Sequence, residues 1–406
     1  MVWSGCATGL GGDTVNSSGT RTVISGEVIG NTGGDVEYWV EYGTTPSYGS
    51  ASAHNTTFDT QPNEARQVFV KLTGLQRSTS YHFRVCAQDS QQSGGPGCGS
   101  DREFTTPNLE CGDTITQDFT LSADVTCESF STDGLIVGAD GIDINLNGHT
   151  LRGPLMGFLD SGSPLAISNA GGHDDVTIRN GTVTSWGSAI VATGASFMVI
   201  RKVSAVGNTS GITLRGGESN TIRTSGMTGS RFRSGLFVDG SDALVVADSS
   251  GTKWDVEGND NRLVRNQIGD AGQFAMCLYV FGHGNRIADN TVGGCPAGNL
   301  VLAAGANNVI LRNETSGAPS DPSTSGEPDG IFVGPFTANT LLQGNYSHDN
   351  DDDGFDVRGT GTRLQDNRAE NNGDWGIDAV AGVTDLGGNT ASGNGNAPQC
   401  HNVFCR

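Results

Sequence analysis

Five aspartates fall within eight positions, from Asp349 to Asp356. His348 comes directly before this run, and Arg358 comes two residues after it. Similar segments recur on both sides, as Asp329-Gly330-Ile331 and as Asp374-Trp375-Gly376-Ile377-Asp378. Carboxylates at this density repel one another. Either a cation lies beside them and they all stay ionised, or some of them hold a proton. The run is therefore suited to a metal site or to an acid and base pair.

These three segments share a Gly-hydrophobic step, which aligns them as successive strands of a stack. Stacked strands lie about 4.8 Å apart, so we expect Asp353 to lie over Asp329, and Asp356 over Asp378. Because side chains alternate along a strand, Asp356 and Arg358 should face the same outer side. The alignment predicts one pocket of carboxylates with a basic group beside it.

Beyond about residue 107, two series of residues recur at regular spacing, here called ladders. Most intervals within each ladder are about 20 to 24 residues long. The first ladder consists of hydrophobic residues at expected strand starts: Ile142, Ile190, Ile212, Leu236, Leu278, Leu300, Ile331, Phe355 and Ile377. The second consists of an aliphatic residue three positions before an Asn: Leu263/Asn266, Ile287/Asn290, Ile310/Asn313, Leu342/Asn345, Leu364/Asn367 and Leu386/Asn389. Two phases at one period indicate a structural repeat.

A repeat of this length with Gly and Asn turns can close on itself only as a coil stacked on its neighbours. Apolar side chains then lie inside the stack, and Asn side chains align at the turns. The segment from Gly141 to Gly153 resembles the opening coils of secreted right-handed parallel β-helix proteins, and so does the strand pair between Cys111 and Cys127. The resemblance implies an all-β fold, with a right-handed parallel β-helix over residues 108–406.

One step of the repeat is longer than the others. Between Leu300 and Ile331 about nine residues are added, and they fall in the Pro, Ser and Gly-rich segment from Ser316 to Pro328. Insertions in a solenoid often gather on its binding face. The segment is either a loop at the rim of the site before Asp329 or a neutral insertion.

Calcium suits the acidic run because it accepts several oxygen ligands from turns, whereas Asp residues can also simply bond to local backbone NH groups. The pair Asp329-Gly330-Ile331 and Asp352-Asp353-Gly354-Phe355-Asp356 resembles the calcium site of family-nine polysaccharide (pectate) lyases. The resemblance implies that Ca²⁺ is bound by four carboxylates: Asp329, Asp352, Asp353 and Asp356.

The same resemblance implies cleavage of a uronic-acid polysaccharide by β-elimination. Calcium would bridge the protein and the uronate carboxylate, and a base would remove the neighbouring proton. That family uses a downstream lysine as the base, but the three lysines of this chain all lie upstream, at Lys71, Lys202 and Lys253. Arg358, Arg363 and His348 are the remaining candidates, and Arg358 is favoured because it should face the same way as Asp356.

Two other functions fit the same residues. A glycoside hydrolase could use Asp353 and Asp378 as paired carboxylates, which in an inverting enzyme lie roughly 6.5 to 9.5 Å apart. A non-catalytic carbohydrate-binding or cell-surface β-helix could use calcium only to stiffen its coils. Exposed aromatic residues that could stack on sugar rings are expected at Trp254, Phe274, Tyr279, Phe336 and Trp375.

Residues 1–107 carry alternating segments that indicate half-buried strands, such as Val36 to Tyr42. The segment from Leu72 to Ala87, followed by a Gly-rich hairpin, resembles a fibronectin type III β-sandwich. Leu75 and Tyr81 then match its tyrosine corner, in which the hydroxyl bonds to an upstream backbone group. A spacer or docking module is the expected role.

Composition limits the partners and the location. A formal charge of −21 argues against nucleic acid and against an anionic membrane surface, and no apolar run is long enough to cross a membrane. No signal peptide is evident at the first residues. The cysteines form close pairs typical of disulfides in an exported, extracellular protein, with Cys6 left over: Cys86/Cys98, Cys111/Cys127, Cys277/Cys295 and Cys400/Cys405. We expect a monomer that binds a polysaccharide.

Overall fold

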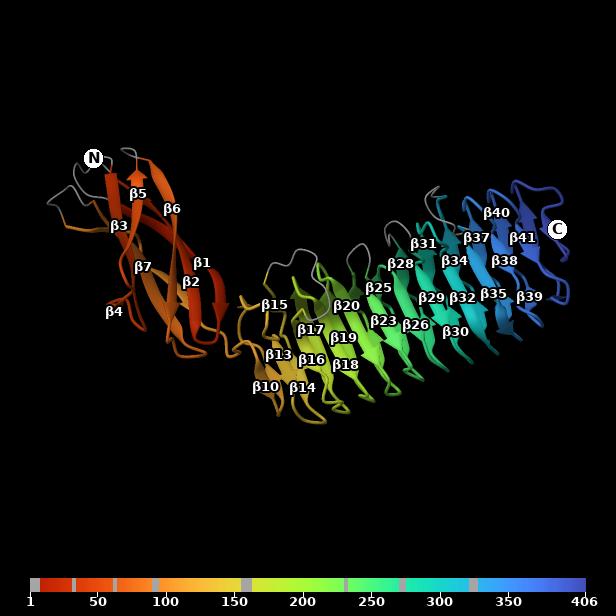
Figure 1. The fold of residues 1–406 in the computed structure, drawn as a ribbon, viewed down its shortest axis with the longest axis horizontal. Coiled ribbons are helices and arrows are strands. Elements are labelled where there is room, and N and C mark those ends of the chain that lie inside the picture. Colours follow the sequence, from red (N-terminus) through yellow and green to blue (C-terminus); the bar gives the residue numbers. More distant parts are fainter. Residues whose placement is uncertain are drawn as a thin grey trace. The chain divides into compact units, whose positions relative to one another are not determined.

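A computed structural model describes residues 8–30, 34–60, 64–89, 95–154, 163–229, 233–269, 275–320 and 328–406. Every regular element in these ranges is a β-strand, so the all-β prediction is confirmed (Figure 1). The described part of the chain accordingly offers no helix that could cross a membrane. Contacts divide the chain into two units, of which the first is Met1–Asp113 with Leu121–Ser129 and His149–Arg152, and the second is the remainder.

The first unit contains a mainly antiparallel sheet in the order β4-β3-β7-β8-β1-β2-β6, with β5 paired to β3 and β9 to β7. Its strands are β1 (Thr8–Ser18), β2 (Arg21–Ile29), β3 (Gly34–Gly43), β4 (Ser50–Ala51), β5 (Asn55–Thr60), β6 (Ala65–Thr73), β7 (Ser80–Asp89), β8 (Gly97–Cys98) and β9 (Arg102–Thr105). The Tyr81 hydroxyl accepts a hydrogen bond of 3.0 Å from the Gln76 backbone, as the tyrosine-corner motif predicts. The strands fit a sandwich, and the fibronectin type III assignment stays a prediction.

The strands after β9 form a right-handed parallel β-helix of about 12 turns, as predicted. One of its sheets has 13 parallel strands: β10 (Asp113–Ile115), β13 (Leu135–Val137), β16 (Leu165–Asn169), β18 (Ser188–Thr193), β20 (Ser210–Arg215), β23 (Leu236–Asp239), β26 (Trp254–Glu257), β29 (Leu278–Phe281), β32 (Leu300–Ala306), β35 (Ile331–Ala338), β38 (Phe355–Val357), β41 (Ile377–Ala379) and β44 (Cys400–His401). The expected strand starts from Ile190 onward lie in this sheet, and their side chains fill the core. Ile142 is also buried, but it directly precedes β14 (Asp143–Asn145), so its expected place in the same series of strands is wrong.

The remaining strands form a 22-stranded sheet. They are β11 (Phe119–Thr120), β12 (Val125–Thr126), β14 (Asp143–Asn145), β15 (Thr150–Arg152), β17 (Thr177–Thr184), β19 (Val199–Ala205), β21 (Thr221–Arg223), β22 (Gly226–Met227), β24 (Val245–Ala247), β25 (Ser250–Gly251), β27 (Arg262–Val264), β28 (Gln267–Gly269), β30 (Arg286–Ala288), β31 (Thr291–Gly293), β33 (Val309–Leu311), β34 (Glu314–Ser316), β36 (Leu341–Gln343), β37 (Tyr346–His348), β39 (Arg363–Gln365), β40 (Arg368–Glu370), β42 (Thr384–Asp385) and β43 (Thr390–Ser392). Most coils contribute two short strands to it and one strand to the 13-stranded sheet.

The first sequence ladder passes over two coils, the one that contains β16 and the one that contains β26. Leu236 and Leu278 are successive steps of the ladder, but β26 lies between them, paired with β23 on one side and β29 on the other. This coil begins with Trp254 in place of a Gly-hydrophobic step, and Trp254 is fully buried. The expectation that Trp254 is an exposed sugar platform is therefore wrong, because its ring occupies the inner position of the strand.

All four expected disulfides are present: Cys86–Cys98, Cys111–Cys127, Cys277–Cys295 and Cys400–Cys405. Cys6 lies outside the described residues, as do Phe274 and residues 321–327 of the expected rim loop. The described start of that loop contacts the acidic turn, where the Ser320 backbone donates a 2.7 Å hydrogen bond to Asp351 Oδ2.

Buried asparagines connect the coils, as the second ladder predicts. The side-chain amide of each Asn donates to the carbonyl oxygen of the next along the series Asn266, Asn290, Asn313, Asn345, Asn367 and Asn389, at 2.9 to 3.1 Å. Each also satisfies a backbone group, as Asn313 does at Ile287 O over 3.0 Å. Since every amide bridges two coils, the ladder fixes the register between them.

Replacing Asn313 by Ala should test the ladder. The change removes hydrogen bonds to both neighbouring coils and leaves buried groups without partners, so we expect a loss of about 3 kcal/mol of unfolding free energy. The urea midpoint, followed by circular dichroism, measures the change. Glu314→Ala, at an exposed neighbouring position, should shift it by less than about 0.5 kcal/mol. Equal shifts in both variants would show that the ladder adds no stability of its own.

Candidate functional site

The last coils bring the predicted carboxylates together on the 13-stranded sheet. β35, β38 and β41 are consecutive neighbours in it (Figure 1), and β44 follows β41. Their register places Phe332, Asp356, Asp378 and His401 in one column. Phe355 and Val357 alternate with Asp356 and are fully buried in the core. The predicted stacking of Asp356 over Asp378 is therefore confirmed.

Arg358 connects the two aspartates of this column. Its Nε contacts Asp356 Oδ1, and its Nη2 lies 2.8 Å from Asp378 Oδ2. Burial works against the charged guanidinium, but the hydrogen bond and charge of Asp356, followed by those of Asp378, outweigh it and raise the pKa of Arg358. Arg358 thus stays cationic, which suits it to hold negative charge and makes it a poor proton acceptor.

His401 completes the column from the next coil. Its Nδ1 lies 2.7 Å from Asp378 Oδ1, and its ring is tilted against Trp375 with 5.5 Å between ring centroids. The imidazole is 54% exposed, whereas Asp378 is 12% exposed. An Nδ1–H donated to a carboxylate leaves a lone pair on Nε2, so the pair can accept a proton from a bound ligand.

His401 is not among the site residues that the sequence predicts. The residue follows Cys400 in the disulfide-bonded tail, where no Gly-hydrophobic step predicts a strand. Its one available signal was distance along the chain, since it lies 23 residues after Asp378, about one repeat.

Asp329 and Asp353 form the buried part of the site. They are only 2% and 6% exposed. The Asp353 backbone donates a 3.2 Å hydrogen bond to Asp329 Oδ1, and the Trp375 backbone donates one of 2.7 Å to Asp353 Oδ1. These bonds tie the two carboxyls to successive coils.

Burial is the main reason why both carboxyls resist ionisation. For Asp329, burial and then the charges of Asp356, Asp353 and Asp352 raise the pKa to about 9. For Asp353, burial outweighs the Trp375 hydrogen bond, and neighbouring carboxylates raise the pKa further, to about 8. Near neutral pH these groups therefore hold protons unless a cation compensates their charge.

Two groups of carboxylates have oxygens within 4.8 Å of one another: Asp352 with Asp353 and Asp374, and Asp353 with Asp356 and Asp378. Hard oxygen donors in this number fit calcium. Three of the four expected ligands belong to these groups, whereas Asp329, among the described residues, belongs to neither. Asp329 is joined to the cluster by the hydrogen bond from the Asp353 backbone, and the charges of the cluster raise its pKa.

The structure does not bring His348 to these carboxylates. His348 lies on β37 in the 22-stranded sheet, where Nδ1 contacts Asp349 at 2.6 Å and Nε2 contacts Glu314 at 3.3 Å. Its ring stacks on Tyr346. The acidic turn that follows carries the chain to the other sheet before Asp356, so closeness in sequence does not become closeness in space. Arg363 likewise lies in the 22-stranded sheet, on β39.

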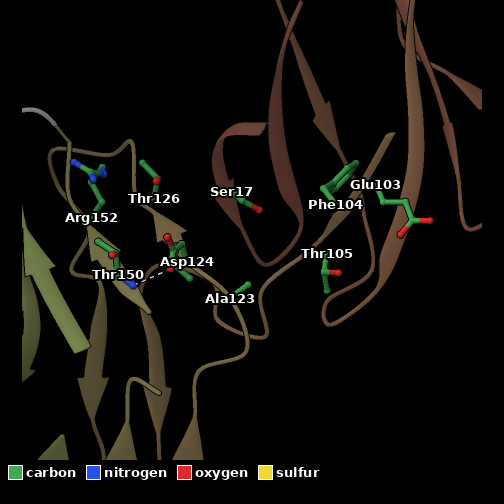
Figure 2. Close-up of a pocket in the computed structure, with 10 residues that line it drawn as sticks. Ser17, Glu103, Phe104, Thr105, Ala123, Asp124, Thr126, Thr150 and Arg152 are labelled. Carbon is green, nitrogen blue, oxygen red and sulfur yellow. Dashed lines mark hydrogen bonds between the residues drawn. The ribbon is translucent and has the colours of Figure 1, made fainter. Parts of the chain in front are cut away.

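A separate hollow of about 350 Å³ lies in the first unit and is lined by residues such as Glu103, Asp124 and Arg152 (Figure 2). Asp124 Oδ1 accepts a 2.9 Å hydrogen bond from the Thr150 backbone and lies 3.2 Å from His149 Nδ1. These contacts hold the local loops together, and we assign no chemistry to this hollow.

Comparison with known proteins bears on the fold. The family described as "Right handed beta helix region" matches residues 165–315. Among curated proteins, no sequence matches this chain. The similar solved structures that were compared are 12 to 15% identical to it in sequence.

Three of those structures illustrate the range. DFA-IIIase from Arthrobacter chlorophenolicus A6 is 14% identical, with a TM-score of 0.41 over 60% of this chain and 68% of that one. A mutant of the periplasmic alginate epimerase AlgG is 13% identical, with a TM-score of 0.46 over 70% and 77%. The sensor domain of the anti-sigma factor RsgI4 from Pseudobacteroides cellulosolvens is 15% identical, with a TM-score of 0.19 over 27% and 99%. None of these likenesses assigns a function to this chain.

The raised pKa values predict how stability depends on pH without divalent cations. The unfolded carboxyls titrate near 3.8, whereas the folded groups titrate at about 9 and about 8. The folded chain therefore holds more protons between these values, and its unfolding free energy falls as pH rises from about 4 to about 8 or 9. The double variant Asp329→Asn/Asp353→Asn should be more stable than wild type at pH 8, and the difference should shrink towards pH 5.

Thermal unfolding in chelator across this pH range measures the effect. Asp366→Asn, at an exposed turn position, is the control for removal of a carboxylate. A difference between the double variant and wild type that is the same at pH 5 and pH 8 would mean that the buried carboxyls do not resist ionisation.

Proposed function

We propose that this protein is an exported carbohydrate-active enzyme that cleaves a uronic-acid-containing polysaccharide by β-elimination. One observation carries the proposal: buried carboxyls that favour a proton or a cation lie beside a fixed guanidinium and an Asp and His pair. Four disulfides support export, since such bonds persist in oxidising compartments. The site has the parts needed to bind a sugar carboxylate and to move a proton beside it.

Calcium is part of this proposal. The oxygens of Asp352, Asp353 and Asp374 would hold it, and Asp356 lies in the second group, which shares Asp353 with the first. When bound, it would neutralise the carboxylates and draw electron density from a uronate carboxylate, which acidifies the proton at the neighbouring C5. Positive charge is also needed for the approach of an anionic polymer, because the chain has a formal charge of −21.

The side chains then divide the work. Arg358 binds the sugar carboxylate and stabilises the negative charge that develops there, because its guanidinium stays protonated. Asp378 orients His401, whose Nε2 accepts the C5 proton. The electrons of that C–H bond form a double bond between C4 and C5, the C4–O bond breaks, and the departing oxygen takes a proton from water. We therefore propose His401 as the base in place of Arg358 or His348.

Glycoside hydrolysis is the second candidate, and one observation favours it. The pKa of Asp353 is raised to about 8, so Asp353 holds a proton at neutral pH, as a general acid requires. Asp378 lies next to it. Their nearest oxygens are within 4.8 Å, which is nearer to the roughly 5 to 5.5 Å of a retaining pair than to the inverting spacing expected from the sequence. Water would then attack a covalent sugar intermediate, and no unsaturated product would form.

The products formed with and without chelator separate these functions. On polygalacturonate or alginate, we expect a new ultraviolet-absorbing double bond in calcium, and its loss after chelation while circular dichroism stays unchanged. Reducing ends without the double bond would contradict β-elimination and support hydrolysis. A fall in melting temperature on chelation, with no cleavage of either polymer, would contradict both and support a non-catalytic β-helix.

His401→Ala should lower kcat/KM by roughly 100-fold to 10,000-fold, because it removes the proton acceptor. Added imidazole should restore part of the rate if His401 acts as a base and not only as a packing group. His348→Ala is the comparison, because His348 is one of the candidate bases in the sequence but lies in the other sheet, and we expect this variant to keep its activity. Normal activity in His401→Ala with loss of activity in His348→Ala would show that His348, and not His401, is the base.

A further inference from the structure

A second feature of the 13-stranded sheet is a cavity of about 780 Å³ over strands β16 to β26, here called the cationic cavity. Three basic side chains line it: Arg215, Arg233 and Lys253. Two carboxylates also line it, Asp133 and Asp255. The lining thus carries an excess of positive charge in a chain of formal charge −21.

Both carboxylates already have partners. Asp133 Oδ1 accepts a 2.8 Å hydrogen bond from the Leu165 backbone. Asp255 accepts a hydrogen bond from Ser234 Oγ and lies 3.8 Å from Lys253 Nζ. No ion pair within 4.0 Å joins Arg215 or Arg233 to a carboxylate in the part of the chain that the structure describes. Two guanidinium groups are therefore available to an anionic ligand.

The rest of the lining suits a sugar. Hydroxyl groups from neighbouring coils face the cavity, and Ser188 lies directly beside Ser210 in the sheet register. Thr213 and Phe237 are likewise adjacent in register. Hydroxyl groups can bond to sugar hydroxyls, while the half-buried Phe237 ring offers an apolar surface for a ring face.

The cationic cavity and the carboxylate cluster share one column of the sheet. Register pairs connect the column without a break through Thr213, Phe237, Asp255, Tyr279, Val301, Phe332, Asp356 and Asp378. Five strand steps separate Phe237 from Asp356, which is about 24 Å at about 4.8 Å per step. Aromatic side chains accompany this path, and Phe281 and Phe336 are 45% and 82% exposed beside it. One extended chain on this face could contact both sites.

We propose that the cationic cavity binds a carboxylate-bearing sugar of the polysaccharide, several sugars away from the carboxylate cluster. The guanidinium groups of Arg215 and Arg233 bind the sugar carboxylate, and Phe237 packs against the ring. The class of ligand rests on the proposed function, whereas binding itself requires neither cleavage nor calcium. The cavity would therefore hold an anionic polymer that the net negative charge of the protein otherwise repels.

Calorimetric titration of the full chain with polygalacturonate, in chelator and low salt, tests the site. Arg215→Ala/Arg233→Ala should weaken binding at least about tenfold, because it removes both unpaired cations. Arg223→Ala/Arg262→Ala removes the same charge from the 22-stranded sheet and should bind like wild type. Dextran, which has no carboxylate, should not bind.

Three results would overturn the proposal: no binding of polygalacturonate by the wild type, equal weakening in both double variants, or equal binding of dextran. Failure of the proposed function looks different. If wild type forms no unsaturated product but the cavity variant alone loses affinity, the binding site stands and the lyase assignment falls. If wild type is active, the cavity variant should raise KM for the polymer and leave KM unchanged for a dimer too short to span both sites.

Discussion

The hydrogen-bonded register between successive coils is the constraint on which the rest of this structure depends. Backbone groups pair along two parallel sheets, and buried asparagine amides add a side-chain bond from coil to coil. A shift of one residue would turn the core side chains of a strand to the outside, so the apolar interior allows only one register. Once the register is fixed, residues about one repeat apart must share a column.

The register also brings the carboxylates of the acidic site together, which is electrostatically unfavourable. Asp356 and Asp378 are neighbours because their strands are, although like charges repel. Arg358 compensates part of this repulsion by bridging both. Asp329 and Asp353 lie deeper and depend on a proton or a cation. A buried carboxylate site of this kind costs stability, which is reasonable where the groups serve binding or catalysis.

Lyase and hydrolase chemistry differ here in what neutralises the carboxyls. A cation would leave them ionised and available as ligands, with Arg358 and His401 acting on the sugar. A proton would leave Asp353 able to donate it to a departing oxygen. The same geometry serves both, so the fold alone does not choose. Positive charge elsewhere on the sheet, at Arg215 and Arg233, favours a ligand that carries carboxylates.

The repeat, the asparagine ladder, the four disulfides and the stacking of Asp356 over Asp378 could all be predicted from the amino-acid sequence. Each of these is a matter of fixed spacing along the chain, and a solenoid converts spacing directly into neighbourhood. Only the tertiary structure placed His401 beside Asp378, buried Trp254 and set His348 on the other sheet. Those outcomes depend on where each turn bends and how far a side chain reaches between coils. The spacing of residues along the chain does not predict where a turn bends or how far a side chain reaches, because turns of different length can join strands of the same register.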